Sequence, residues 1–201
     1  MSPQGELKVG DRMNRRAFFG GSLGVGALAL GAPWVATASA ATEDELAFAN
    51  FGASTEFLVK DFYIKALKAN VVSAAQTATL KRGRSAAGQH AKALTDLLRG
   101  AGDVAPAPED FDFQWPDGTF QSEKEIVSTG TGVLRALLGA YQTAAASVSN
   151  PAYRVLYASL AASVSQQLAT LAARAGQHAI EPFPTAMDLE AASDALEAYL
   201  G

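Results

Sequence analysis

Few side chains in this 201-residue sequence have a type and a spacing that could support catalysis. The chain has two histidines, His90 and His178, and no cysteine. Without cysteine it cannot form disulfides, use a thiolate nucleophile, ligate an iron–sulfur cluster or bind zinc through sulfur. Neither histidine belongs to a nucleophile motif, and the sequence has no phosphate-binding glycine loop. The residue types therefore disfavour hydrolase and nucleotide-dependent chemistry.

Glu56 and His90 are polar residues within apolar helical patterns. Glu56 precedes Lys60 by four residues, the order that favours an ion pair along one helix face. A buried carboxylate needs a counter-charge, so we expect Lys60 to be its partner. His90 shares a helix face with Ala87 and Leu94, which favours a hydrogen-bonded histidine in or beside the core.

Three other polar residues have simpler interpretations. Tyr63 and Tyr141 are expected to pack in the core with their hydroxyls in water, rather than to relay electrons. His178 follows the last long helical pattern and is expected at the surface.

The elements that must position these residues are helices. Alanine is abundant, apolar residues recur at helical spacing, and capping patterns precede the helical stretches. The caps are Thr42 with Glu45, Ser73 with Gln76, Ser122 with Glu125, and Asn150 before Pro151. Four long helices are predicted at 43–69, 74–99, 122–148 and 151–175, and a short fifth helix at 188–200.

Connection lengths predict how these helices are arranged. Short connections make the first two helices one antiparallel hairpin and the next two another. About twenty residues separate the hairpins, enough to run the length of a bundle, and their aromatic residues should pack against it. A lid over a site would have the same composition. We predict an all-α, ferritin-like four-helix bundle with a long crossover between helices 2 and 3 and a short C-terminal helix.

The first 40 residues differ in kind from the rest. Arg15 and Arg16 precede a glycine-rich apolar stretch over 17–31, and a small-x-small cleavage signal ends at Ala40. This order predicts a twin-arginine signal peptide over 1–40, cleaved after Ala40, and one domain over 41–201. The alternatives are an ordinary secretory signal or an uncleaved anchor, and Met13 could be the true start.

Cleavage would place the domain in the periplasm, the cell envelope or the outside medium, with no membrane span in the mature form. The formal net charge of −4 does not favour a nucleic-acid partner, because such proteins carry a basic face.

One segment of the domain resembles a known family. Residues 49–58, Ala-Asn-Phe-Gly-Ala-Ser-Thr-Glu-Phe-Leu, followed by Phe62-Tyr63, resemble the first helix of bacterial ferritin-like domain proteins. The stretch from Pro182 to Asp188 resembles the tail of that family, and its members often carry a similar leader. The resemblance covers roughly residues 42–200.

The resemblance implies a pair of metal ions, with a carboxylate from each of two helices and a Glu-x-x-His pair from each of the other two. Glu56 fits one carboxylate and His90 one histidine, but Ala87 occupies the matching acid position. In the fourth helix Val164 and Gln167 replace the pair. Two of six ligands remain, so we interpret Glu56 and His90 as vestiges of a degenerate metal site.

Three hypotheses follow from this interpretation. The first is a non-catalytic exported bundle that needs no cofactor and binds a protein partner or itself. The second is a metal-binding oxidase or iron-storage protein with a rearranged site, built from Glu56, His90 and Asp61 or from ligands shared across a dimer interface. Asp61 or Glu123 placed beside Glu56 would favour it. The third is a carrier of a small apolar ligand, which would need a cavity lined by Gly52, Ala53, Ala87 and Val164.

Overall fold

A computed structural model of the chain describes residues 41–174 and 184–200. Arg15, Arg16, Ala40 and His178 lie outside the described residues, as does the predicted end of the fourth helix. The described elements are α2 (Glu43–Ala69), α3 (Ala74–Gly100), η1 (Pro108–Asp110), α4 (Glu123–Ser147), α5 (Pro151–Arg174), α6 (Leu189–Leu196) and η2 (Glu197–Tyr199). The predicted all-helical fold is confirmed, although the predicted fifth helix ends as an α-helix at Leu196.

The helix starts are capped as their local sequence requires. Thr42 Oγ1 accepts from the backbone N of Glu45 at 3.3 Å, and Glu45 Oε2 accepts from the N of Thr42 at 2.9 Å. Ser73 Oγ accepts from the N of Gln76 at 3.2 Å. The side chain of Gln76 does not reach back, because its Nε2 donates to the carbonyl of Leu171 at 3.4 Å. That reciprocal cap, expected from the sequence, is therefore only half formed.

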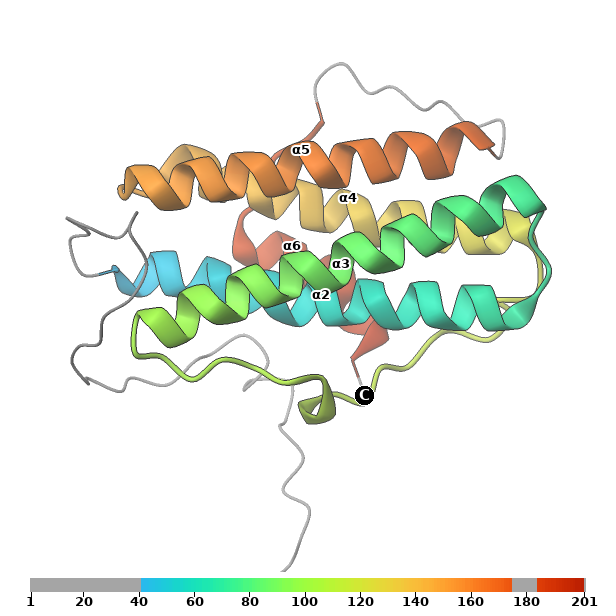
Figure 1. The fold of residues 1–201 in the computed structure, drawn as a ribbon, viewed down its shortest axis with the longest axis horizontal. Coiled ribbons are helices and arrows are strands. Elements are labelled where there is room, and N and C mark those ends of the chain that lie inside the picture. The colour runs from blue at the N-terminus through green and yellow to red at the C-terminus, as the bar shows by residue number, and fades with distance from the viewer. Residues whose placement is uncertain (1–40, 175–183, 201) are drawn as a thin grey trace, which may run out of the picture.

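The four long helices form two hairpins, α2 with α3 and α4 with α5, which pack α2 against α4 and α3 against α5 (Figure 1). Glu123 at the start of α4 accepts from the backbone N of Ser73 at 2.9 Å, so α3 and α4 begin at the same end. At the other end, Glu45 near the start of α2 accepts from Ser149, just before α5. The crossover thus returns the chain along the bundle, as predicted.

The crossover between Gly100 and Glu123 packs on α2, as its aromatic residues led us to expect. Trp115 Nε1 donates to Asp61 Oδ2 at 2.7 Å, and the ring of Trp115 lies 5.5 Å from that of Phe62. The backbone N of Gln114 donates to the carbonyl of Tyr199, which joins the crossover to the C-terminal segment. Nothing in this packing resembles an open lid.

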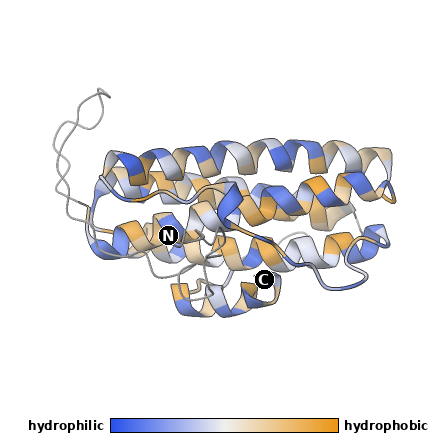
Figure 2. Cartoon of the chain, turned by 90° about the horizontal axis from the view of Figure 1, so that it is seen from below, coloured by the Kyte–Doolittle hydropathy of each residue, from blue (hydrophilic) through white to orange (hydrophobic). Residues whose placement is uncertain are grey.

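The buried hydrophobic residues of the helices form one core cluster. Hydrophobic and hydrophilic residues are interspersed along each long helix (Figure 2). Leu58 and Leu137 are fully buried near the middle of α2 and α4, and Leu171 is fully buried in the last turn of α5. Within the described part of the chain, no helix is long and apolar enough to cross a bilayer.

Candidate functional site

Glu56 lies in the middle of α2, and none of its surface is exposed to solvent. Its Oε1 accepts a hydrogen bond from the hydroxyl of Tyr141 at 3.1 Å, and Nδ1 of His90 lies 2.9 Å from the same oxygen. These three residues, from α2, α3 and α4, are here called the Glu56 cluster. His90 is 13% exposed, so the cluster meets the surface only along the imidazole.

The expected ion pair between Glu56 and Lys60 is wrong. Oε1 of Glu56 is taken by His90 and Tyr141, and its buried Oε2 has no hydrogen-bond partner. The spacing rule identified a neighbour along the helix surface, but Glu56 points into the bundle, where partners come from other helices. The expectation that His90 is a hydrogen-bonded residue beside the core is confirmed.

Burial controls the ionisation of the Glu56 cluster. Removal from water raises the pKa of Glu56, and the hydrogen bond and charge of His90, followed by the bond from Tyr141, offset only part of that rise. Burial and the nearby charge of Glu56 raise the pKa of Tyr141 far above its usual range. Tyr141 therefore keeps its proton and acts as a donor to the carboxylate.

A second buried pair lies on the side of α5. The hydroxyl of Tyr63 donates to Oε1 of Gln167 at 3.0 Å, while Nε2 of Gln167 is buried without a partner. Burial and then the charge of Glu56 raise the pKa of Tyr63, which places this pair within electrostatic reach of the cluster. The sequence correctly placed both tyrosines in the core, and their hydroxyls donate to Gln167 and Glu56.

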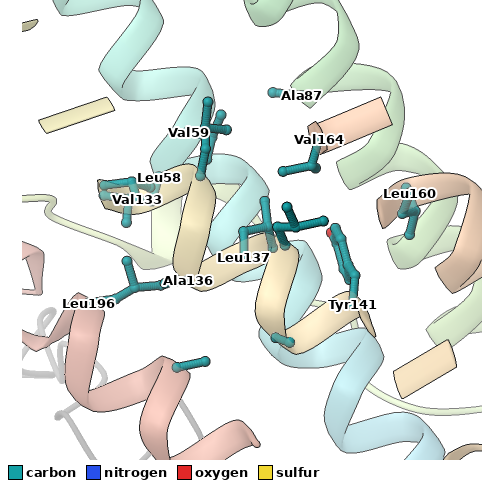
Figure 3. Packing of buried hydrophobic residues seen from close by; sticks show 14 of the residues in the cluster. Leu58, Val59, Ala87, Val133, Ala136, Leu137, Tyr141, Leu160, Val164 and Leu196 are labelled. Atoms are coloured by element: carbon teal, nitrogen blue, oxygen red, sulfur yellow. The ribbon is translucent and has the colours of Figure 1, made fainter. Parts of the chain in front are cut away.

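The positions where a metal centre would need further ligands carry apolar side chains. Ala87 and Val164 are both fully buried, and Figure 3 shows them around the same interior space as Tyr141. Neither can donate an electron pair to a cation. Across residues 41–174 and 184–200, no group of three or more histidine, aspartate or glutamate side chains could hold a metal ion. One carboxylate and one imidazole do not fit a two-metal site, whose bridging positions need several oxygen ligands.

The two acids that could have rearranged the site lie elsewhere. Asp61 accepts from Trp115 and pairs with Lys65 at 3.0 Å, on the side of α2 that the crossover covers. Glu123 caps the α2–α3 turn through Ser73 at one end of the bundle. Neither carboxylate lies beside Glu56.

The centre of the bundle is filled where the carrier hypothesis needs a cavity. A methyl group on Gly52 would lie 2.9 Å from Cε1 of Tyr141, so the tyrosine ring already occupies this space. Ala53, Ala87 and Val164 are fully buried. A shallow groove instead lies outside, between α2 and α6, and is lined by Ala47, Phe51, Leu189, Glu190, Ser193 and Asp194.

Glu45 is a second buried carboxylate, whose long-range role the sequence analysis missed. Its Oε1 accepts from the backbone N of Ser149 at 2.9 Å and of Asn150 at 2.7 Å, and from the hydroxyl of Ser149 at 3.0 Å. Burial opposes its ionisation, but the bonds from Thr42, Asn150 and Ser149 outweigh burial and lower its pKa. The Thr42 cap pattern was the visible signal; nothing local indicated the link to the α4–α5 turn.

Comparison with known proteins agrees with the resemblance seen in the sequence. A family model described as a ferritin-like domain matches residues 44–177, which span the four long helices. Searches of curated proteins and of solved structures found no match.

Proposed function

We propose, from the premise that this chain belongs to the ferritin-like domain family, that it is an exported binding or structural protein whose bundle centre performs no metal chemistry. The observation that carries this proposal is the Glu56 cluster. His90 and Tyr141 both contact one oxygen of Glu56. Ala87 and Val164, whose side chains are apolar and buried, stand where the family's metal ligands are expected. No cofactor is then needed.

The Glu56 cluster has the groups that a buried carboxylate needs. An isolated carboxylate inside a protein is strongly unfavourable unless hydrogen bonds or an opposite charge compensate it. His90 and Tyr141 offer both kinds of compensation, since a protonated imidazole is a cation and a phenol is a donor. The residues of this chain can therefore hold Glu56 without a cation, and the centre acts to support the fold.

One observation favours the alternative of a metal-binding oxidase or iron-storage protein. The buried Oε2 of Glu56 has no partner, and an orphaned carboxylate oxygen next to an imidazole is a feature of incomplete metal sites. A carrier of apolar ligands has no comparable support, because Tyr141 fills the space beside Gly52.

Metal content separates the first two functions. The full chain would be incubated aerobically with ferrous iron, desalted, and measured by mass spectrometry for metal per chain. We expect almost no retained iron, and the same result for Glu56→Gln. About two irons per chain that disappear in Glu56→Gln would overturn the proposal and favour the oxidase or storage protein.

Export is proposed from the leader alone. Arg15, Arg16 and the small residues up to Ala40 match the order of a twin-arginine signal, which carries proteins that have already folded. The product would be periplasmic, bound to the envelope, or extracellular. In a bacterial host that has this pathway, Arg15→Lys with Arg16→Lys should retain the full-length chain in the cytoplasm. N-terminal sequencing of the exported wild-type protein should begin at Ala41; export of the double variant at the wild-type level would argue for a different signal.

A further inference from the structure

The charges of this acidic chain are separated between two faces of the bundle. α3 carries five basic residues and one acid, Asp96, and α5 beside it contains Arg154 and no acid. The bases of α3 are Lys81, Arg82, Arg84, Lys92 and Arg99, and all five are exposed. They extend over about 27 Å of helix. We call this surface the basic face.

The basic face keeps most of its charge uncompensated within the chain. Lys92 and Arg99 share Asp96, at the C-terminal half of α3. Across the described residues, no hydrogen bond or ion pair of a side chain involves Lys81, Arg82 or Arg84. Three guanidinium or ammonium groups within four residues are thus available to an outside partner.

Two segments on the other side of the bundle contain acids and no bases. The crossover, residues 101–122, contains five acids and no lysine or arginine, and residues 184–200 contain four acids and no base. The two segments are joined, because Gln114 bonds to Tyr199 and the ring of Trp115 lies 5.0 Å from that of Tyr199. We call this joined surface the acidic face; Glu109, Glu190 and Asp194 are among its exposed carboxylates.

The helices α2 and α4 separate the two faces. The crossover lies on α2 through Asp61 and Trp115, and the C-terminal segment lies on α4, where the N of Met187 donates to the carbonyl of Gly139 at 3.1 Å. α3 packs on α2 and α5, and it lies in front of α6 in the view of Figure 1. Within the described residues, bases therefore outnumber acids on the exposed side of α3, and acids outnumber bases on the side of the crossover, where Lys65 of α2 is paired with Asp61.

We infer that copies of this chain associate head to tail, the basic face of one copy against the acidic face of the next. A second copy is the partner that these observations favour, because each face finds its opposite on the same molecule and complementary potentials steer association. Two faces on opposite sides make a heterologous contact, which extends into a chain or closes into a ring. This inference rests on the proposed function as a binding or structural protein and names its partner.

The test uses the full chain and two variants with altered faces. Lys81→Glu with Arg84→Glu removes the net positive charge of α3, and Glu190→Lys with Asp194→Lys makes α6 basic. No side-chain bond within the described residues is lost in either variant, because none involves these four side chains, and circular dichroism would check that both stay helical. Sedimentation velocity at low salt measures the mass of each variant alone and of their equimolar mixture.

We expect wild-type mass to rise with concentration at low salt and to fall to the monomer in about 1 M salt, where screening acts over roughly 3 Å. Each variant alone should remain monomeric, and the mixture should associate, since an acidic face again meets a basic one. A wild type that is monomeric up to millimolar concentration, or a mixture that stays monomeric, would overturn the inference. The partner of α3 would then be a different molecule with many negative charges. Iron measured on the same samples separates the two proposals: retained iron with intact association contradicts only the metal-free function.

Discussion

Tyr141 and Glu56 are joined in two ways at the centre of the bundle. The hydroxyl of Tyr141 donates to Oε1 of Glu56 at 3.1 Å, and its ring occupies the space over Gly52, one turn of α2 before Glu56. The same side chain thus compensates the buried carboxylate and closes the space around it. The free energy of a buried, ionised carboxylate depends on every donor around it, so substitutions in this cluster should change the stability of the protein.

Glu56→Gln should stabilise the protein at neutral and alkaline pH. Burial raises the pKa of Glu56 in the folded state, so the folded chain binds more protons than the unfolded chain between the unfolded pKa of about 4.3 and the raised value. Stability therefore falls as pH rises through this window. Glutamine keeps an acceptor for Tyr141 and His90 but carries no charge. We expect a gain of about 1 kcal/mol at about pH 8, measured by urea unfolding.

That gain should shrink toward about pH 3, well below the unfolded pKa of about 4.3, where Glu56 is protonated in both states and resembles the amide. Glu43→Gln, at an exposed position in the first turn of α2, controls for the loss of one negative charge. A Glu56→Gln variant less stable than wild type at about pH 8 would mean that the carboxylate charge is needed by a partner, and a bound cation would be the first to test for.

Tyr141→Phe should destabilise the fold by about 1–3 kcal/mol, because it removes a donor to a buried carboxylate while leaving the ring in place. The loss should be larger at about pH 8 than at about pH 5, since the missing bond favours the ionised form of Glu56. Tyr157→Phe is the matched control: the hydroxyl of Tyr157 donates to the backbone carbonyl of Glu45 at 3.0 Å, which carries no titrating charge. Equal, pH-independent losses in the two variants would contradict the coupling between Tyr141 and the charge of Glu56.

Glu45→Gln should have the opposite sign to Glu56→Gln, although both residues are buried glutamates of α2. Hydrogen bonds from Thr42, Asn150 and Ser149 overcome burial and lower the pKa of Glu45 in the folded state. Its contribution is therefore present above the unfolded pKa of about 4.3 and is lost as pH falls through the folded pKa.

Both oxygens of Glu45 accept hydrogen bonds from backbone N–H groups, one at Thr42 and the other at the α4–α5 turn. Glu45→Gln replaces one oxygen by an NH₂ group, so two donors would face each other at one of these places. We therefore expect a loss of about 2 kcal/mol near neutral pH. Thermal unfolding from about pH 7 to about pH 3 should show this loss shrinking with acid. A constant loss would show that packing, and not ionisation, is responsible.

The helices were predictable from the sequence because their signals are local. Thr42, Ser73 and Ser122 each cap a helix within three residues, and the predicted starts agree with the structure to within one residue. The crossover topology followed from connection length alone. Gln76 shows the limit of such rules, because a tertiary acceptor, the carbonyl of Leu171, competes successfully with the local cap.

The site was predictable in composition but not in contacts. The sequence identified Glu56 and His90 as polar residues in apolar helices, and the family match agrees with the resemblance that suggested ligand roles for them. It placed Tyr141 in the core but could not pair it with Glu56, which lies 85 positions away, because the local sequence does not show which faces of α2 and α4 are in contact. The Lys60 expectation failed for the same reason: helix spacing describes neighbours on one helix and carries no information about the interior.

Two glycines of α3 should respond in opposite directions to the same substitution. A methyl group on Gly83 would lie 2.4 Å from Cζ of Tyr63, whose ring is buried and whose hydroxyl is held by Gln167, so the ring cannot move without losing that bond. Gly88→Ala meets no atom within 4 Å. Alanine lowers the entropy of the unfolded chain and favours helix, so Gly88→Ala should stabilise by about 0.5–1 kcal/mol. Gly83→Ala has the same helix benefit but should destabilise by about 1 kcal/mol or more, because overpacking a rigid core commonly costs about 1–3 kcal/mol.

Urea unfolding of both variants measures the difference, which isolates the contact with Tyr63 from helix propensity. Stabilisation of similar size at both positions would mean that Tyr63 moves freely, and that its bond to Gln167 does not hold the ring against α3.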